Sequence, residues 1–287
     1  MDNALKICKH LYAAIVDGPC EGEITFIDRY ELDIDSPIGI VRLYSEGVLR
    51  PYSCLVPATM NFLKMAVSIG EKVFLGPDEI DFNDADIVFS LKLAEKVDLS
   101  ANALGLFLPL DLKQRLRYLQ RAVELSDEAG GFSGLLTESE GVPYAMDARL
   151  KNLTEATKNE EPEVIRAAAT ECSGLGEGRF PASDSLLCGY MLAYTAFSCS
   201  MGRKWENVRV VNRAILEGAV TNTTRESGFL LWLASNGLTD EEGCQLFRSL
   251  FSDKPYPNLM ACATSSTKRN GCDWMVGICT FLRYFAF

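Results

Sequence analysis

A glycine-rich segment that leads into an apolar run is the part of the sequence best suited to chemistry. It runs Gly174-Leu-Gly-Glu-Gly-Arg-Phe-Pro-Ala-Ser-Asp-Ser-Leu-Leu-Cys-Gly189. Glycine adopts backbone angles that other residues avoid, and the first turn of a helix has unpaired N–H groups at its positive end. Such a helix start attracts anions, so the segment indicates a site for a phosphate or a carboxylate. The alternative is a glycine-rich connection that lets two helices pack closely.

Two familiar nucleotide-binding motifs are excluded by the surrounding residues. A dinucleotide fingerprint follows a strand, whereas residues 164–171, just before this loop, have the pattern of a helix. A nucleotide-hydrolase phosphate loop needs Gly-Lys-Ser/Thr, but Gly178 is followed by Arg179 and Phe180. The sequence therefore predicts neither type of nucleotide site.

A second segment, near the C-terminus, resembles the first in miniature. Asn270-Gly-Cys-Asp273-Trp-Met-Val-Gly277 has a turn glycine, an aspartate near a predicted helix start and a further glycine one turn later. We expect the two helix starts to lie side by side and to face one cleft. A chance likeness between two short Gly/Asp segments is the alternative.

Composition and charge limit the partners of the protein. The chain has 287 residues, 48% of them hydrophobic, with a formal net charge of −11. That charge argues against nucleic acid and anionic membranes, because both require a basic surface. The longest apolar runs are shorter than the roughly 20 residues of a membrane span, and no export signal is evident. We expect a cytoplasmic protein.

The cysteine and histidine positions do not predict a metal or cofactor site. The 10 cysteines are scattered without a Cys-x-x-Cys pair, which tetrahedral metal sites commonly use. We expect reduced cysteines in the core. His10 is the only histidine and falls in a predicted N-terminal helix, where a catalytic role is the less favoured interpretation. We assign no metal and no cofactor, although Asp184 and Asp273 with water are a possible Mg²⁺ pair.

The first part of the chain, residues 1–100, has the pattern of a small β domain. Apolar residues alternate with polar ones from about Glu23 to Leu93, and Ser36-Pro37 and Gly76-Pro77 interrupt the runs. We expect a small, mostly-β sheet or partial barrel with a helix, and the segment Thr59–Val67 also has a helical pattern.

The remainder, residues 101–287, is predicted to be a larger all-helical domain, which makes the fold class α+β. Leu112, Leu116, Leu119 and Val123 share one helical face. The basic residues of the same helix, Arg115, Arg117 and Arg121, are interpreted as a solvated surface. In the helix after the glycine loop, the small residues Ser185, Gly189 and Ala193 form a stripe that another helix could approach closely.

Three motifs together resemble one known family. The glycine loop, the segment Thr223-Thr-Arg-Glu-Ser227-Gly and the final Asn270-Gly-Cys-Asp273 segment occur in the order seen in the AllH (YlbF) proteins. That family is the third subunit of a bacterial oxamate carbamoyltransferase. The resemblance implies purine/allantoin catabolism and partner protein subunits.

The family pattern is altered in this chain. In the first family motif, the usual threonine, serine, glycine and second aspartate are replaced by Phe180, Ala182, Ser183 and Ser185. In the last motif, the usual histidine, Thr/Ser and serine are replaced by Lys268, Arg269 and Asn270. Phe180 removes a helix-capping hydroxyl, and we expect Ser183 to supply an alternative cap. Loss of one carboxylate and gain of basic side chains, including Arg225, favour an anionic ligand.

Two functions follow from these observations. In the first, the chain is a carbamoyltransferase-type subunit that binds a small anionic ligand at paired helix N-termini. Asp184 and Asp273 are the candidate catalytic residues, which would orient neighbouring groups or shuttle a proton, with a purely structural role as the alternative. The second function is a non-catalytic binding or scaffold protein, so whether the chain is an enzyme stays open. The candidate ligand-binding residues are Gly174, Gly176, Gly178, Arg179, Ser183, Thr224, Ser227, Lys268, Asn270 and Gly271.

Overall fold

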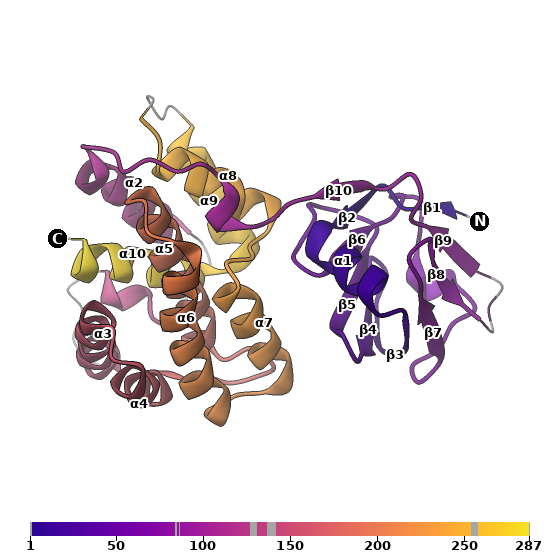
Figure 1. Cartoon of the computed structure of the whole chain (residues 1–287), viewed down its shortest axis with the longest axis horizontal. Coiled ribbons are helices and arrows are strands. Elements are labelled where there is room, and N and C mark those ends of the chain that lie inside the picture. The colour runs from indigo at the N-terminus through magenta and orange to yellow at the C-terminus, as the bar shows by residue number, and fades with distance from the viewer. Residues whose placement is uncertain are drawn as a thin grey trace. The chain divides into compact units, whose positions relative to one another are not determined.

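The computed structural model describes residues 2–83, 85, 87–126, 131–136, 142–253 and 258–286 (Figure 1). The chain divides into two compact units, Met1–Leu99 and Ser100–Phe287. The first is a curled β-sheet with a helix, and the second is built of helices, so the predicted α+β fold class is confirmed.

The described strands of the N-terminal unit form one curled sheet, in which residues 2–8 supply β1 at one end and β2 next to the strand at the other end. The order is β1-β9-β8-β7-β3-β4-β5-β6-β2-β10. Residues 2–8 pair through β1 with β9, and through β2 with β6 and β10. The bounds are β1 (Asp2–Asn3), β2 (Lys6–Cys8), α1 (Lys9–Asp17), β3 (Cys20–Ile27), β4 (Glu31–Ser36), β5 (Gly39–Tyr44), β6 (Ser53–Leu55), β7 (Lys72–Leu75), β8 (Glu79–Phe82), β9 (Ile87–Ser90) and β10 (Glu95–Val97).

Strands β4 and β5 show how the alternating pattern builds this unit. They are antiparallel, with Leu32 opposite Leu43 and Ile34 opposite Val41, and all four side chains are fully buried. Successive side chains in a strand point to opposite faces. The intervening residues therefore form a second, polar face on the same two strands.

The predicted helix at Thr59–Val67 is wrong. Only one 3-10 turn, η1 (Phe62–Lys64), forms there, between extended residues Asn61 and Met65. The N–H of Phe62 donates to the carbonyl of Arg29 rather than to a residue of its own segment. This tertiary hydrogen bond and the burial of the Phe62 ring hold the segment against the sheet.

In the second unit, α5 runs through the middle, with α6, α7 and α10 packed around it (Figure 1). Its predicted apolar face is buried, and Tyr190 and Tyr194 are among the largest fully buried side chains. The bounds are η2 (Ala101–Ala103), α2 (Leu112–Glu124), η3 (Ser133–Leu135), α3 (Val142–Asn159), α4 (Pro162–Cys172), α5 (Ala182–Ser200), α6 (Trp205–Ala219), η4 (Val220–Asn222), α7 (Arg225–Ser235), α8 (Glu241–Leu250), α9 (Leu259–Asn270) and α10 (Cys272–Phe285).

Helix α2 confirms one sequence expectation and corrects another. Its predicted apolar face is buried, but Arg115 is buried too and does not belong to a solvated surface. Its Nε donates to Asp111 at 2.8 Å, and its Nη1 donates to the carbonyl of Ser249 at 2.9 Å. Carbonyls in the last turn of a helix have no partner within the helix, so Arg115 supplies a hydrogen-bond donor to the end of α8. Arg117 and Arg121 are exposed, as predicted.

All 10 cysteines are reduced, and most of them are buried. Burial raises the pKa of Cys54 and of Cys172 to about 12, so these thiols stay protonated and act as small apolar groups. Among the described residues, no helix has the length and apolar character that a membrane crossing requires.

Candidate functional site

The carboxylate of Asp184 connects three segments at the start of α5. Its Oδ1 accepts the N–H of Gly174 at 2.8 Å, and its Oδ2 accepts the hydroxyl of Ser227 at 2.7 Å and that of Thr223. The Asp184 side chain is buried, so it has exchanged water for these donors. Asp184 therefore fixes the first residue of the glycine loop and the start of α7 against α5.

The glycine loop passes close to backbone atoms that leave no room for side chains. Gly174 has a φ of +70°, and an added Cβ would lie 2.0 Å from the carbonyl oxygen of Asn222. A Cβ at Gly176 would lie 2.7 Å from the amide nitrogen of Ala182. Gly178 faces open space, and residues 176–180 are exposed. The loop is thus anchored at its beginning and presented to solvent at its tip.

Ser183 binds the loop instead of capping α5, so the expected alternative cap is wrong. Its hydroxyl oxygen accepts the N–H of Leu175 at 2.8 Å, and its own N–H donates to the carbonyl of Leu175 at 3.0 Å. The N-cap residue of α5 is Pro181, which makes no side-chain cap. Leu175 and Ser183 thus exchange two hydrogen bonds, and the Ser183 hydroxyl is used by the loop rather than by the end of α5.

The end of the loop is tied to α7. The hydroxyl of Thr224 donates to the carbonyl of Arg179 at 2.7 Å and accepts the N–H of Ser227, which caps α7. The guanidinium of Arg179 forms an ion pair with Glu226 at 3.1 Å. Gly174, Arg179, Ser183, Asp184, Thr224 and Ser227 are therefore brought together, as the candidate site requires.

The second predicted aspartate plays a similar part at the start of α10. Asp273 accepts the N–H of Phe132 at 2.8 Å and that of Gly131 at 3.2 Å. Burial raises the pKa of the Asp273 carboxyl, and the two backbone hydrogen bonds oppose that rise without cancelling it. Asp273 thus holds the segment before η3 against α10.

The other residues of this segment lie at the junction of α9 and α10. Gly271 joins the two helices with a φ of +87°, and the amide of Asn270 donates to Asp240, the capping residue of α8, at 3.2 Å. Lys268 is exposed in the last turn of α9.

Helices α5 and α10 run in the same sense. Gly277 meets the backbone at Leu186, and the ring of Phe281 contacts that of Tyr190 at 5.2 Å between centroids. One turn further, Phe285 lies 5.8 Å from Tyr194. Because contacts advance in the same order along both helices, their starts lie on the same side of the crossing.

Gly131 links the two starts. Its N–H donates to Asp273 in α10, and an added Cβ on Gly131 would lie 3.4 Å from the Cβ of Ala182 in α5. The predicted side-by-side arrangement of the two helix starts thus appears in the fold. A shared cleft and a ligand role for these residues remain predictions.

Three residues that donate to the two aspartates are not in the sequence prediction. Thr223 donates to Asp184, and Gly131 with Phe132 donates to Asp273. The doubled Thr223-Thr224 before a predicted helix was an available signal, since threonine is common at helix starts. Nothing near Gly131 in the sequence indicates a partner 142 residues away.

Among the described residues, no group of three or more His, Cys, Asp or Glu side chains could hold a metal ion.

These features define a helical unit organised around a glycine loop and two adjoining helix starts. The family model described as oxamate carbamoyltransferase subunit AllH matches residues 172–282. The match begins at the last residue of α4 and extends through most of α10, and it confirms the resemblance to the AllH family over these residues. No curated protein and no solved structure matches the chain.

Proposed function

We propose that this chain is a subunit of an oxamate carbamoyltransferase-type assembly, and that its helical unit binds a small anion at the starts of α5 and α10. The family match over residues 172–282 carries the proposal, because it includes both helix starts and the α7 start between them in sequence. The anion would be the phosphate or carboxylate group of a small molecule.

The tip of the glycine loop and the start of α10 are the better candidates for contact with the anion. At the start of α5, the N–H groups of Ser183 and Asp184 donate to the carbonyls of Leu175 and Pro181. Those amides are already used. Residues 176–180 are exposed, and Gly271, the N-cap residue of α10, makes no side-chain cap. Arg179 in the loop and Lys268 before α10 would supply positive charge.

The hydrogen bonds of Asp184 and Asp273 support an orienting role for both carboxylates. Asp273 accepts two backbone N–H groups from a segment distant in sequence. Asp184 accepts the N–H of Gly174 and the hydroxyls of Thr223 and Ser227. A carboxylate with these donors positions a loop well but has fewer sites left for a substrate proton. Their catalytic role as proton carriers stays a prediction.

The hydrogen bonds of Asp184 and Asp273 also favour the second candidate function, a non-catalytic binding or scaffold subunit. Both candidate carboxylates are bound to donors of this chain, and its one histidine, His10, belongs to the N-terminal unit. In this alternative the helical unit keeps its fold and its subunit surfaces, and the reaction takes place on a partner.

Calorimetric titration of the full chain with carbamoyl phosphate, oxamate and inorganic phosphate tests the proposal. Arg179→Gln and Lys268→Gln should each weaken binding by about tenfold, as expected for loss of one hydrogen bond to a charged group. Arg209→Gln, an exposed change on α6, is the control.

Co-purification with the partner subunits distinguishes the two functions. A chain that joins its partners but releases no heat with any of the three ligands, alone or in the complex, is a scaffold. A chain that neither binds a ligand nor joins partner subunits contradicts both.

A further inference from the structure

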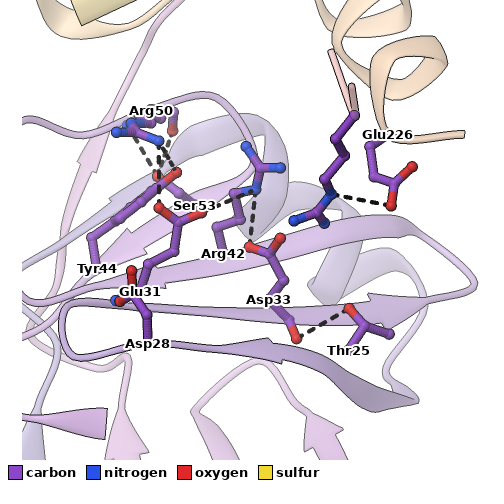
Figure 2. Close-up of polar contacts among 10 residues, drawn as sticks. Thr25, Asp28, Glu31, Asp33, Arg42, Tyr44, Arg50, Ser53 and Glu226 are labelled. Carbon is purple, nitrogen blue, oxygen red and sulfur yellow. Dashed lines mark hydrogen bonds and ion pairs between the residues drawn. The ribbon is translucent and has the colours of Figure 1, made fainter. Parts of the chain in front are cut away.

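The polar face of β4 and β5 gathers four charged or phenolic groups on one patch of the N-terminal unit (Figure 2). In the strand register, Asp33 lies opposite Arg42 and Glu31 lies opposite Tyr44. Arg50, from the segment between β5 and β6, reaches the same patch. None of these residues belongs to the proposed site of the helical unit.

Two guanidinium groups converge on one carboxylate in this patch. Arg42 Nε lies 3.9 Å from one oxygen of Glu31, and Arg50 Nη1 lies 3.7 Å from the other. Both distances are those of ion pairs and exceed a normal hydrogen bond. Glu31 is thus held by charge between two arginines without a short bond to either, and its side chain is 25% exposed.

Each of the two arginines also makes a shorter contact with another residue. Arg42 Nε lies 3.0 Å from Oδ1 of Asp33, a fully buried carboxylate. Arg50 lies over the ring of Tyr44 at 4.3 Å, and its Nη1 donates to the phenol oxygen at 2.6 Å. Burial raises the pKa of Tyr44 to about 12, so the phenol keeps its proton at neutral pH.

The backbone of Arg50 is fixed as well. Its N–H donates to the hydroxyl oxygen of Ser53 at 3.0 Å, and the Ser53 hydroxyl donates to its carbonyl at 2.6 Å. Removing Glu31 would therefore leave two guanidinium groups in place, held from other directions. This is the arrangement of a preorganised clamp for an oxyanion.

We propose that Arg42 and Arg50 form an anion-binding site in the N-terminal unit, which takes the carboxylate or phosphate group of a small ligand in place of the Glu31 side chain. In the free chain, Glu31 occupies the position between the guanidinium groups. When the ligand binds, the partly exposed Glu31 turns toward solvent, while the buried Asp33 stays with Arg42. The proposal goes beyond the function of the helical unit and does not depend on it.

Charge balance sets the strength of this site. Arg42 and Arg50 face Glu31 and Asp33 across the patch, and Asp28 lies at its edge. Burial, followed by Asp33 and Asp28, raises the pKa of Glu31, and the two arginines oppose that rise. Protonation of Glu31 removes the competing negative charge, so the anion should bind more tightly as the pH falls through that pKa.

Nitrogen-15 NMR of the arginine Nε–H groups in the full chain tests the proposal, with inorganic phosphate and malonate as separate probes. Glu31→Gln should tighten binding by about tenfold, and Arg50→Gln should weaken it by at least about tenfold. Arg50→Lys keeps the charge without the planar fork and should retain part of the affinity. Glu21→Gln and Arg29→Gln, exposed changes in the same unit, are the matched controls.

Arg179→Gln separates this site from that of the helical unit, and should leave the Arg42 signal and its titration unchanged. Thermal melting by circular dichroism establishes that each variant is folded. Unchanged phosphate and malonate affinity in folded Arg50→Gln, or no tightening in Glu31→Gln, would overturn the proposal. Loss of binding to one probe alone would identify which of the two anion classes the clamp accepts.

Discussion

Gly189 of α5 and Gly277 of α10 allow each helix to lie against the backbone of the other. An added Cβ on Gly189 would lie 1.9 Å from the carbonyl oxygen of Trp274, and one on Gly277 would lie 1.9 Å from that of Leu186. Backbone atoms cannot move aside as side-chain ends do. This reciprocal contact therefore fixes the crossing that sets both helix starts on one side.

Replacement of Gly189 by alanine should force α5 and α10 apart. We expect a loss of at least about 1–3 kcal/mol in the free energy of unfolding, the usual cost of an overpacked core. Urea denaturation measures this loss. Gly228→Ala in α7 is the control, because its Cβ would meet nothing closer than 3.8 Å and alanine favours a helix. Equal stability of the two variants would contradict the close crossing.

Asp184→Asn should loosen the glycine loop. The amide has one acceptor oxygen where the carboxylate has two, so at least one of the donors Gly174, Thr223 and Ser227 loses its partner. We expect a destabilisation of about 2–4 kcal/mol and faster tryptic cleavage after the exposed Arg179. Asp253→Asn, an exposed change, should alter neither. Unchanged cleavage in Asp184→Asn would show that the carboxylate does not hold the loop.

Arg115→Met should destabilise the helical unit although it keeps most of the side-chain volume. The carbonyls of Ser249 and Leu250 would lose their donor inside the protein. The expected cost is about 2–3 kcal/mol in the free energy of unfolding. Arg117→Met, a change at an exposed position of the same helix, should cost little stability. Similar melting temperatures for both variants would restore the solvated-surface interpretation.

The raised pKa of Asp273 predicts a pH dependence with a definite sign. Between its ordinary value of 3.8 and its higher folded value, the native state binds more protons than the unfolded state. Relative to Asp273→Asn, the wild-type chain should therefore gain stability as the pH falls through this window. Urea titrations across that range measure the difference.

Asp147 supplies the contrast for this measurement. Burial acts to raise its pKa, but hydrogen bonds from Lys151 and Tyr284 outweigh it and lower the pKa below 3.8. Its contribution is lost only as the pH falls below 3.8, so Asp147→Asn should show no wild-type gain above that value. A matching gain for both aspartates would contradict the assignment to Asp273.

Local patterns were sufficient to predict elements whose own residues decide their structure. The spacing of Leu112, Leu116 and Leu119 predicted the buried face of α2, and Gly189 marked the stripe where α10 approaches. Arg115 was misassigned because hydrophobic periodicity registers only apolar residues. A buried cation whose partner is the end of another helix leaves no mark in the local pattern.

In the candidate site too, local patterns predicted the positions of some residues but not their distant partners. Asp184 and Asp273 were selected because they follow glycines near helix starts, and both occupy those positions. Their main partners come from distant segments, such as Gly131 and Ser227, which no local rule connects with them. Likewise, the register that places Arg42 beside Asp33 depends on how β4 and β5 pair, and periodicity alone did not single out that patch.

The pairing of residues 2–8 with β9 and β10 bears on the order in which the N-terminal sheet can form. Residues 2–8 are made before their neighbours β9 and β10, which begin only at Ile87 and Glu95. Pairing segments so distant in sequence is entropically costly and slow. The sheet can therefore close only after β9 and β10 have been made, and until then β1 lacks its partner strand.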